Sequence, residues 1–403
     1  MDEPRKRISI WSKTYTCALL ANILLTFSQQ TVSALMTTYA KYLGAGAMVT
    51  GLVTGLYFAV AVAARPFAGP VITKCDKKKV MIYTYIIGII TSVGYAFCNS
   101  IPMFILVRIF HGIEFAFVGS LSLTIIGDCT PKERLGLAVG MIGVGISLCA
   151  ALGPNLGLAI NNWAAAKWGE SGGYTAVFLA SAILMVVAII PAFMLPNSKP
   201  SKEVLAGLGP WYKNIICKEA ILPAVLMCFT SISSMLFTSY LVPVAKERGI
   251  ENIGLYFTVY AIVTLATRPF CGKLVDKLGI ERVFYPGCVV YILTFVIAAF
   301  ATKLWMLFIA GFIAAISYGT VNPAIMALTV RCTTAEKRGV ASNTQYFGLD
   351  IGNFLSPTLG GIVYALWGYA SMFLIVGIVP ILLSLLYFSL AWKTAKEHLD
   401  PEG

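Results

Sequence analysis

Two carboxyl groups lie deep inside long apolar stretches of this sequence, where ionisable side chains are scarce. Glu114 lies about 18 Å along a helix from the start of its stretch, near position 102. Asp350 lies at a similar depth in a later stretch. An ionisable group costs about 2.5 to 3.5 kcal/mol at the middle of a lipid bilayer, so each acid is a candidate functional residue. A buried carboxyl group can be neutral when protonated and charged when wetted, which suits proton transfer.

Glu114 shares its stretch with two basic residues, Arg108 and His111, at successive spacings of three residues. Neighbours at this spacing can interact on a helix surface. Two interpretations stay open, a fixed structural pair of Arg108 with Glu114 or a proton-transfer group. His111 taken alone is more typical of a hydrogen-bonded packing residue. We favour Asp350 as a shared proton and substrate site, because its helix face is otherwise uncharged and polar, and we expect Arg108 and His111 to hold Glu114 ionised.

Polar side chains recur at helical spacing in several of these stretches. A polar stripe facing lipid would be unfavourable, so these faces are expected to line a cavity. Such residues can alternatively bond neighbouring helices. The predicted cavity residues are Asn22, Thr26, Gln29 and Ser33 in the first stretch, Tyr318 and Asn322 in the tenth, and Asn343, Tyr346 and Asn353 beside Asp350 in the eleventh.

The elements that must position these residues are membrane-spanning helices. Hydrophobic residues make up 58% of the 403 positions and charged residues 12%, which is too apolar for a soluble protein of this length. We identify twelve apolar stretches, each long enough to cross a hydrocarbon core of about 30 Å. They run approximately over 14–40, 48–72, 80–100, 102–128, 135–162, 173–195, 220–245, 251–275, 283–302, 304–329, 339–364 and 368–392.

The formal net charge of +12 is explained by membrane topology rather than by nucleic acid binding. Most of the 30 Lys and Arg residues fall in loops on the side that carries the N-terminus. The positive-inside rule therefore predicts that both termini are cytoplasmic and that the number of spans is even. The first stretch is too long for a signal peptide and lacks an obvious cleavage site. We expect a multi-pass protein of the cell membrane, meaning the inner or plasma membrane.

The chain contains an internal duplication. The run Arg-Pro-Phe-Ala-Gly at 65–69 returns as Arg-Pro-Phe-Cys-Gly at 268–272, an offset of 203 positions. Both halves begin on the same side of the membrane, so an axis along the membrane normal should relate them. We predict an all-α membrane protein with 12 transmembrane helices in two six-helix halves. The halves are placed at 1–195 and 220–403, and the proline-containing segment 196–219 is a cytoplasmic linker.

The loop after the repeated run resembles a motif of the major facilitator superfamily, Gly-x-Leu-Ala-Asp-Arg-x-Gly-Arg-Arg. The second half matches it at Gly272 and Asp276, whereas the first half keeps Gly69 but has Thr73 in place of the acid. In that family the loop acid helps to close a cytoplasmic gate. The resemblance implies that Asp276 pairs with Arg134. In the first half, Asp128 is expected to supply the missing charge and to face Arg338.

Two further motifs resemble this superfamily. Arg108 and Gly112 match the pattern Leu-x-x-Arg-x-x-Gln-Gly, whose arginine is implicated in proton transfer in proton-coupled relatives. The fifth stretch is similar to the Gly-x8-Gly-x3-Gly-Pro-x2-Gly-Gly pattern of drug/proton antiporters, which implies export. Small residues in this pattern can also serve helix packing. The matching positions are Gly140, Gly153, Pro154 and Gly157, whereas Cys149 and Leu158 depart from the pattern.

Together these features predict a secondary active transporter that works by alternating access. Proton-coupled efflux, or antiport, of small organic or drug-like compounds is favoured. The alternative is a proton-coupled symporter or facilitator that imports a small metabolite or an organic anion. The sequence has no phosphate-binding loop and no zinc spacing, so we expect no metal, no cofactor and no enzymatic activity. The expected partners are a small-molecule substrate, protons and membrane lipid, with the chain acting as a monomer and binding no nucleic acid.

Overall fold

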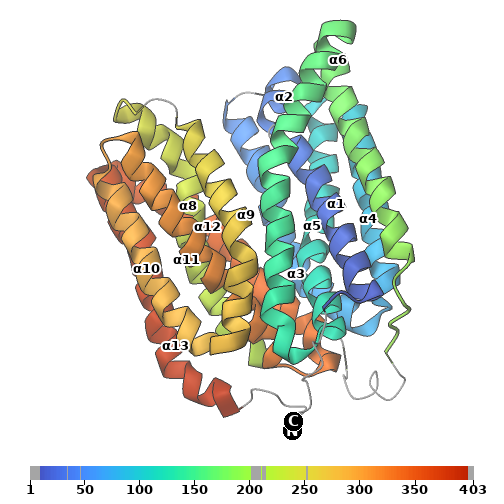
Figure 1. Ribbon diagram of the computed structural model, residues 1–403. Coiled ribbons are helices and arrows are strands. Elements are labelled where there is room, and N and C mark those ends of the chain that lie inside the picture. Colours follow the sequence, from blue (N-terminus) through green and yellow to red (C-terminus); the bar gives the residue numbers. More distant parts are fainter. Residues whose placement is uncertain are drawn as a thin grey trace.

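The computed structural model describes residues 10–33, 35–45, 47–200, 210, 215–250 and 253–397. Among these residues the regular secondary structure is helical, and no strand occurs. Figure 1 shows two groups of helices side by side, one from each half of the chain. The expected all-α architecture in two halves is therefore confirmed.

The first group of helices is formed by residues before position 200. Long apolar runs favour helices here, and Asp76 caps one of them by accepting a hydrogen bond from the Lys78 amide at 3.0 Å. The group contains α1 (Lys13–Ser33), α2 (Met36–Tyr42), α3 (Ala47–Lys74), α4 (Lys77–Ala96), α5 (Ile101–Cys129), the 3-10 helix η1 (Lys132–Arg134) and α6 (Leu135–Phe193).

The second group follows the linker. It contains the 3-10 helix η3 (Lys218–Ala220), α8 (Ile221–Glu247), α9 (Gly254–Leu278), α10 (Ile280–Phe300), α11 (Leu304–Arg331), the 3-10 helix η4 (Ala335–Lys337), α12 (Arg338–Met372), the π-helical segment η5 (Phe373–Ile378) and α13 (Val379–Glu397). A buried apolar core runs through this group from α8 to α13.

Two of these helices each contain two rods joined at a glycine. The break in α6 is Gly169, with φ of 76°, and the break in α12 is Gly368, with φ of 77°. Glycine adopts this left-handed backbone readily because it has no Cβ atom. The residues between these predicted stretches, 163–172 and 365–367, are helical apart from the break at Gly169, and Gly368 begins the last stretch. When the two rods of α6 are counted separately, and the end of α12 after Gly368 is counted with η5 and α13, the described residues hold the twelve long helical rods that the hydropathy predicted.

Eight helices among the described residues are long and apolar enough to cross a membrane. Both rods of α6 are counted there as one helix, and so are α12 and α13 together. α1 and α9 fall outside this set because polar or charged residues interrupt them, among them Gln29 and Gln30 in α1 and Arg268 and Asp276 in α9. α1 contributes to the cavity described below, and α9 contributes to the interface between the halves.

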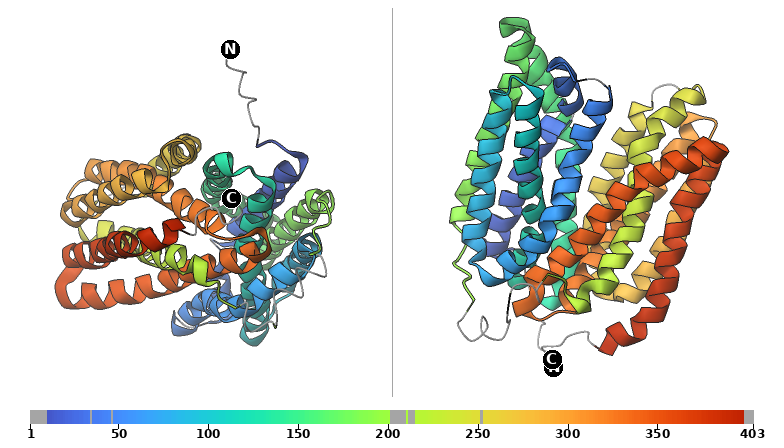
Figure 2. Two further views of the ribbon diagram at one scale, coloured as in Figure 1. Left: turned by 90° about the horizontal axis from the view of Figure 1, so that it is seen from below. Right: turned by 180° about the vertical axis from the view of Figure 1, so that it is seen from behind.

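The two halves meet through equivalent pairs of helices. α6 packs on α9, and α12 packs on α3 and α5. Because α12 and α9 repeat α6 and α3 in the duplicated sequence, the α6–α9 and α12–α3 contacts are related by the duplication. We call them the α6–α9 seam and the α3–α12 seam. Figures 1 and 2 show the halves together at the end where α1 begins and α13 finishes, and farther apart at the other end. We call the former the closed end.

Candidate functional site

A central cavity of about 470 Å³ lies mainly within the first half and reaches α12. Five of the predicted cavity residues line it, namely Asn22, Thr26, Gln29 and Ser33 of α1 and Tyr346 of α12. Arg108 and His111 of α5 line it as well. Aromatic and aliphatic side chains complete the wall, including Tyr57, Phe58, Phe115, Ile142, Ile146 and Leu349. The cavity therefore combines apolar surface with a few polar groups, as small-molecule sites usually do.

The polar stripe of α1 serves the cavity and also joins helices. Asn22 Nδ2 donates a hydrogen bond to Ser122 Oγ of α5 at 2.8 Å. One turn past Thr26, Gln29 Nε2 donates to Glu114 Oε1 at 3.1 Å. Both roles that the sequence left open, cavity lining and helix bonding, are thus carried by the same residues.

Glu114 is fully buried on α5, directly behind Gln29. Its second oxygen, Oε2, accepts no hydrogen bond from a described residue. We had expected Arg108 and His111 to hold this acid ionised, but the partner that the structure gives it is the neutral amide of Gln29. The reason is geometric, because Arg108 lies almost two turns away along α5 and its guanidinium group faces His111 instead.

Arg108 and His111 form a compact cluster with two tyrosines. Arg108 Nη1 lies 3.4 Å from His111 Nδ1, and the Tyr95 hydroxyl lies 3.2 Å from the same ring nitrogen. The Arg108 guanidinium carbon lies 4.9 Å from the centre of the Tyr57 ring, a cation–π contact. This cluster presents a basic, aromatic surface to the cavity.

Asp350 is completely buried and forms an ion pair with Arg65 of α3. The Arg65 Nε to Asp350 Oδ2 distance is 2.8 Å, and the side chains are 1% and 0% exposed. Arg65 Nη1 also donates to the Ala116 carbonyl and the Ser120 hydroxyl, each at 2.6 Å. The pair joins the two halves across the α3–α12 seam.

The surroundings of Asp350 therefore differ from the uncharged helix face that the sequence suggested. Arg65 is a functional residue that the sequence analysis did not identify. The sequence signal that could have identified Arg65 is its position as the first residue of the repeated Arg-Pro-Phe run. Tyr346 lies beside the pair, with its ring centre 5.1 Å from the Arg65 guanidinium carbon.

The remaining predicted cavity residues lie outside the central cavity. Asn343 is buried in the α3–α12 seam, where its Nδ2 donates to the Arg65 carbonyl at 2.5 Å. Asn322 donates to the Tyr318 hydroxyl at 3.1 Å, a contact within α11. Asn353 is half-buried farther along α12. None of the four is among the residues lining the cavity, so a substrate role for them stays a prediction.

Asp276 fastens the α6–α9 seam at the closed end. Its two carboxylate oxygens accept hydrogen bonds from the backbone N–H groups of Gly136 at 2.7 Å and Leu137 at 2.9 Å. These amides belong to the first turn of α6, where a negative charge is favoured by the helix dipole. Arg331 of α11 lies 3.5 Å from the same acid. The expected partner, Arg134, directly precedes α6, but the direct contacts are made by the amides and Arg331.

The α3–α12 seam has a different closure at the same end. Asp128 bridges two helices, accepting from Arg338 Nη1 of α12 at 3.1 Å and from Lys77 of α4. The expected pairing of Asp128 with Arg338 is thus present. Thr73, which stands where the second half has Asp276, lies against Gly339 without a hydrogen bond from its buried hydroxyl to a described residue. This seam lacks the charged cap found in the other seam.

Motif glycines allow backbones to approach closely at both seams. A Cβ at Gly272 would overlap the Gly136 carbonyl oxygen, and one at Gly69 would lie 3.0 Å from Asn343 Nδ2. In α6, Gly140 packs against the Arg268 carbonyl of α9, whereas Gly153 and Gly157 pack against α1. Pro154 lies within α6 between the last two contacts. The glycine-rich motif therefore packs one helix on two neighbours in this conformation.

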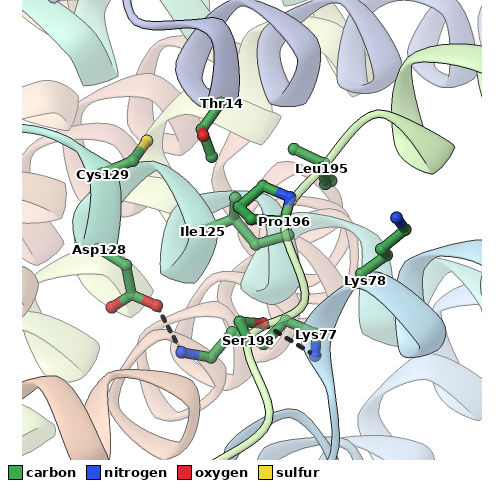
Figure 3. A pocket seen from close by; sticks show the side chains of 9 residues that line it. All are labelled: Thr14, Lys77, Lys78, Ile125, Asp128, Cys129, Leu195, Pro196 and Ser198. Carbon is green, nitrogen blue, oxygen red and sulfur yellow. Dashed lines mark hydrogen bonds and ion pairs between the residues drawn. The ribbon is translucent and has the colours of Figure 1, made fainter.

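A second hollow of about 200 Å³ lies at the closed end and was not predicted. Figure 3 shows Ser198, at the start of the linker, beside Lys77, with Lys77 reaching toward Asp128. The Lys77 amide donates to Ser198 Oγ at 3.2 Å. The hollow and the central cavity have no lining residue in common. The contact between Ser198 and Lys77 joins the linker to α4.

Comparison with known proteins agrees with this architecture. The sequence model of the Major Facilitator Superfamily matches residues 18–252 and 224–403. Multidrug resistance protein MdtG of Klebsiella pneumoniae (strain 342) is 24% identical over 410 residues, covering 97% of each chain. MdtG of Salmonella schwarzengrund (strain CVM19633) is 24% identical over 385 residues, covering 90% of this chain and 91% of the relative.

Two solved structures share the fold. The proton:xylose symporter XylE bound to 6-bromo-6-deoxy-D-glucose superposes with a TM-score of 0.74 and 14% identity, covering 95% of both chains. The human organic anion transporter MFSD10 (TETRAN) superposes with a TM-score of 0.68 and 14% identity, covering 96% of this chain and all of the other, at 100%. At these identities the likeness concerns the fold alone.

Proposed function

Because the chain belongs to the Major Facilitator Superfamily, we propose that it is a secondary transporter that exports small organic compounds in exchange for protons. Three observations support this. The MdtG relatives, which are named as multidrug resistance proteins, align over nearly the whole chain. The glycine pattern of α6 resembles that of drug/proton antiporters. The cavity has a mixed aromatic and polar wall suited to varied small molecules.

We further propose the orientation and organisation of the chain. The closed end carries basic residues such as Lys77, Lys132 and Lys277, so the positive-inside rule assigns it to the cytoplasm together with both termini. The functional units are the halves 1–195 and 220–403, with 196–219 as the linker between them. The chain works as a monomer in lipid of the cell membrane and moves a substrate without converting it.

The single observation that carries the mechanism is the buried pair of Arg65 and Asp350 between the halves. Leaving one member of such a pair without its counter-charge costs about 3 to 5 kcal/mol. Opening the closed end must separate these groups, since they belong to α3 and α12. A proton on Asp350 removes the attraction, and Oδ1, which accepts no hydrogen bond from a described residue, is the oxygen available to it.

Breaking and restoring the Arg65–Asp350 pair sets the order of steps in proton-coupled exchange. The form closed at the cytoplasmic end takes up a proton at Asp350, opens inward, releases the proton and binds its substrate. Return to the closed form carries the substrate outward and restores the ion pair. A proton moving down 100 mV releases about 2.3 kcal/mol, enough for roughly a 50-fold gradient of a neutral compound at one-to-one coupling. Glu114 is the second candidate for the coupling acid, with Arg108 and His111 beside the cavity.

The test uses purified protein in lipid vesicles with an imposed pH gradient and a panel of fluorescent dyes and drugs. Asp350→Asn should abolish uphill transport but retain downhill exchange, because the cavity is unchanged while the titratable charge is lost. Glu114→Gln is the matched control, as it removes the other buried acid and can keep a hydrogen bond to Gln29. Full uphill transport by Asp350→Asn, together with its loss in Glu114→Gln, would transfer the coupling role to Glu114.

One observation favours a second candidate function, the import of an organic anion with protons. Arg108 and His111 place basic groups in the cavity wall, where they can recognise an anionic substrate. Accumulation assays in cells with and without the protein separate the candidates. Lower accumulation in expressing cells supports export, and higher accumulation supports import.

A further inference from the structure

The duplication places two arginines at equivalent positions in the two seams. Arg65 of α3 and Arg268 of α9 each begin the repeated motif, and each lies where its helix packs on the other half. Arg65 has a counter-charge in Asp350. The position equivalent to Asp350, 203 residues earlier, is Ser147 of α6. The α3–α12 seam therefore pairs its arginine with an acid. The α6–α9 seam contains Arg268 but has no acid at the equivalent position.

The environment of Arg268 differs from that of Arg65 in a second way. Tyr346 stacks on Arg65, and its equivalent in α6 is Gly143. The Arg268 guanidinium group lies against Gly143 so closely that a Cβ atom there would overlap Nη1. The missing side chain thus creates the space that the guanidinium group occupies between the two halves.

Arg268 is 9% exposed, and its side chain forms no hydrogen bond or ion pair with any residue that the structure describes. Its Nε atom is fully buried and unsatisfied. On the side of the second half the Arg268 side chain lies against α11, where a Cβ atom at Gly319 would lie 3.9 Å from Arg268 Cγ. A buried cation is costly unless it is paired and hydrogen-bonded. The seam therefore contains a donor group without an acceptor.

Arg268 lines neither the central cavity nor the cavity of the second half, but residues close to it line both. Gly143, against which it packs, is one residue from Ile142 and three from Ile146, and both of these line the central cavity. Tyr260, eight residues before Arg268 on α9, lines a smaller cavity of about 70 Å³ in the second half. That cavity is strongly aromatic, with Phe237, Tyr256 and Tyr291 also in its wall.

We propose that Arg268 binds the anionic group of a transported aromatic organic acid, whose ring packs beside Tyr260. Guanidinium groups match the planar geometry of carboxylates with paired hydrogen bonds, and aromatic side chains provide surface for a ring. The assignment rests on the proposed function, since it names a substrate class for the same transporter. It differs from the Arg108–His111 cluster, which lies in the first half and already has internal partners.

The binding test uses the full-length protein in detergent with two probes of equal size, 1-naphthoate and the neutral 1-naphthamide. Wild-type protein should bind naphthoate at least about tenfold more tightly than naphthamide in calorimetry, since a hydrogen bond to a charged group contributes on this scale. Arg268→Gln should lose this preference, and Arg268→Lys should keep part of it. Equal binding of both probes by wild type would overturn the proposal.

A second variant keeps the test valid if Arg268→Gln fails to fold. Ser147→Asp recreates in the α6–α9 seam the acid that Asp350 provides in the other, so it should neutralise Arg268 and abolish the preference for naphthoate. Ser147→Asn, which adds the same bulk without charge, should retain it. An unchanged naphthoate preference in Ser147→Asp would overturn the assignment to Arg268. Complete displacement of naphthoate by 150 mM chloride, relative to gluconate, would assign an inorganic anion and overturn the substrate class.

Transport measurements separate this inference from the proposed function. If no compound in the dye and drug panel is moved by a pH gradient, the exporter proposal fails while the binding result stands. If neutral compounds are exported but naphthoate shows no dependence on Arg268, the inference fails alone. The expected result is that Arg268→Gln reduces naphthoate export at least about tenfold more than the export of a neutral dye.

Discussion

Replacement of Asp276 by Asn should weaken closure at the closed end. The carboxylate accepts two hydrogen bonds, from the Gly136 amide at 2.7 Å and the Leu137 amide at 2.9 Å, across the α6–α9 seam. Asparagine retains one acceptor oxygen and turns an NH₂ group toward the other amide. The loss is therefore about one charge-assisted hydrogen bond, or about 1.5 to 3 kcal/mol.

This energy changes the ratio of closed to open forms by roughly 10-fold to 150-fold. A protein closed at this end 99 times in 100 would, at about 2 kcal/mol, be closed only about three times in four. Hydrogen exchange read by mass spectrometry measures the effect where it arises. The peptide that contains Gly136 and Leu137 should exchange at least about tenfold faster in Asp276→Asn, because these amides lose their acceptor.

Thr73→Val provides the matched control at the equivalent position of the first half. The Thr73 hydroxyl is buried and bonds no described residue, so its removal should leave exchange at the start of α12 within about twofold of wild type. Unchanged exchange in Asp276→Asn would refute the assignment of the closure energy to this acid. Equal acceleration in both variants would show that general loosening, rather than the carboxylate, is responsible.

Three further outcomes are expected. Thr73→Asp should place an acid opposite the start of α12, stabilise the closed form and slow transport about tenfold in vesicle assays, whereas faster transport would exclude a second cap at this position. Gly157→Ala should lower the free energy of unfolding by about 1 to 3 kcal/mol, measured by thermal unfolding, because the new Cβ would overlap the Thr31 carbonyl oxygen. Gly319→Ala is the control and should be tolerated, since its Cβ would have its nearest neighbour at 3.9 Å. Asp128→Asn should reduce closure less than Asp276→Asn, since its contacts with Arg338 and Lys77 are partly exposed to water, and a larger effect by hydrogen exchange would reverse that ranking.

Local sequence patterns predicted the parts of the molecule that depend on one helix at a time. The helices follow from long apolar runs, and the face of α1 that contains Asn22, Thr26 and Gln29 follows from a period of 3.6 residues. The burial of Glu114 and Asp350 follows from their distance to the ends of their stretches. These properties need no knowledge of how the helices are arranged around one another.

Partners across the molecule could not be predicted in the same way. Arg65 and Asp350 are 285 positions apart, and their contact depends on the conformation in which the halves close. The Gln29 partner of Glu114 likewise requires the position of α1 relative to α5. The extension of both rods of α6 up to Gly169 was also not predicted, because the polar residues around this glycine resemble a loop in hydropathy.

Asp276 and Asp350, one in each seam, lie at different depths below the closed end. Asp276 is two residues before the end of α9, whereas Asp350 is twelve residues into α12, about 18 Å along the helix. Water entering from the closed end would therefore hydrate Asp276 first and Asp350 only after the gap had lengthened. Opening should therefore proceed in order, with the Asp276 contacts separating before the Arg65–Asp350 pair, at which we propose that the proton acts. In a duplicated chain the two seams can thus open at different stages, the α6–α9 seam at Asp276 and the α3–α12 seam at Asp350.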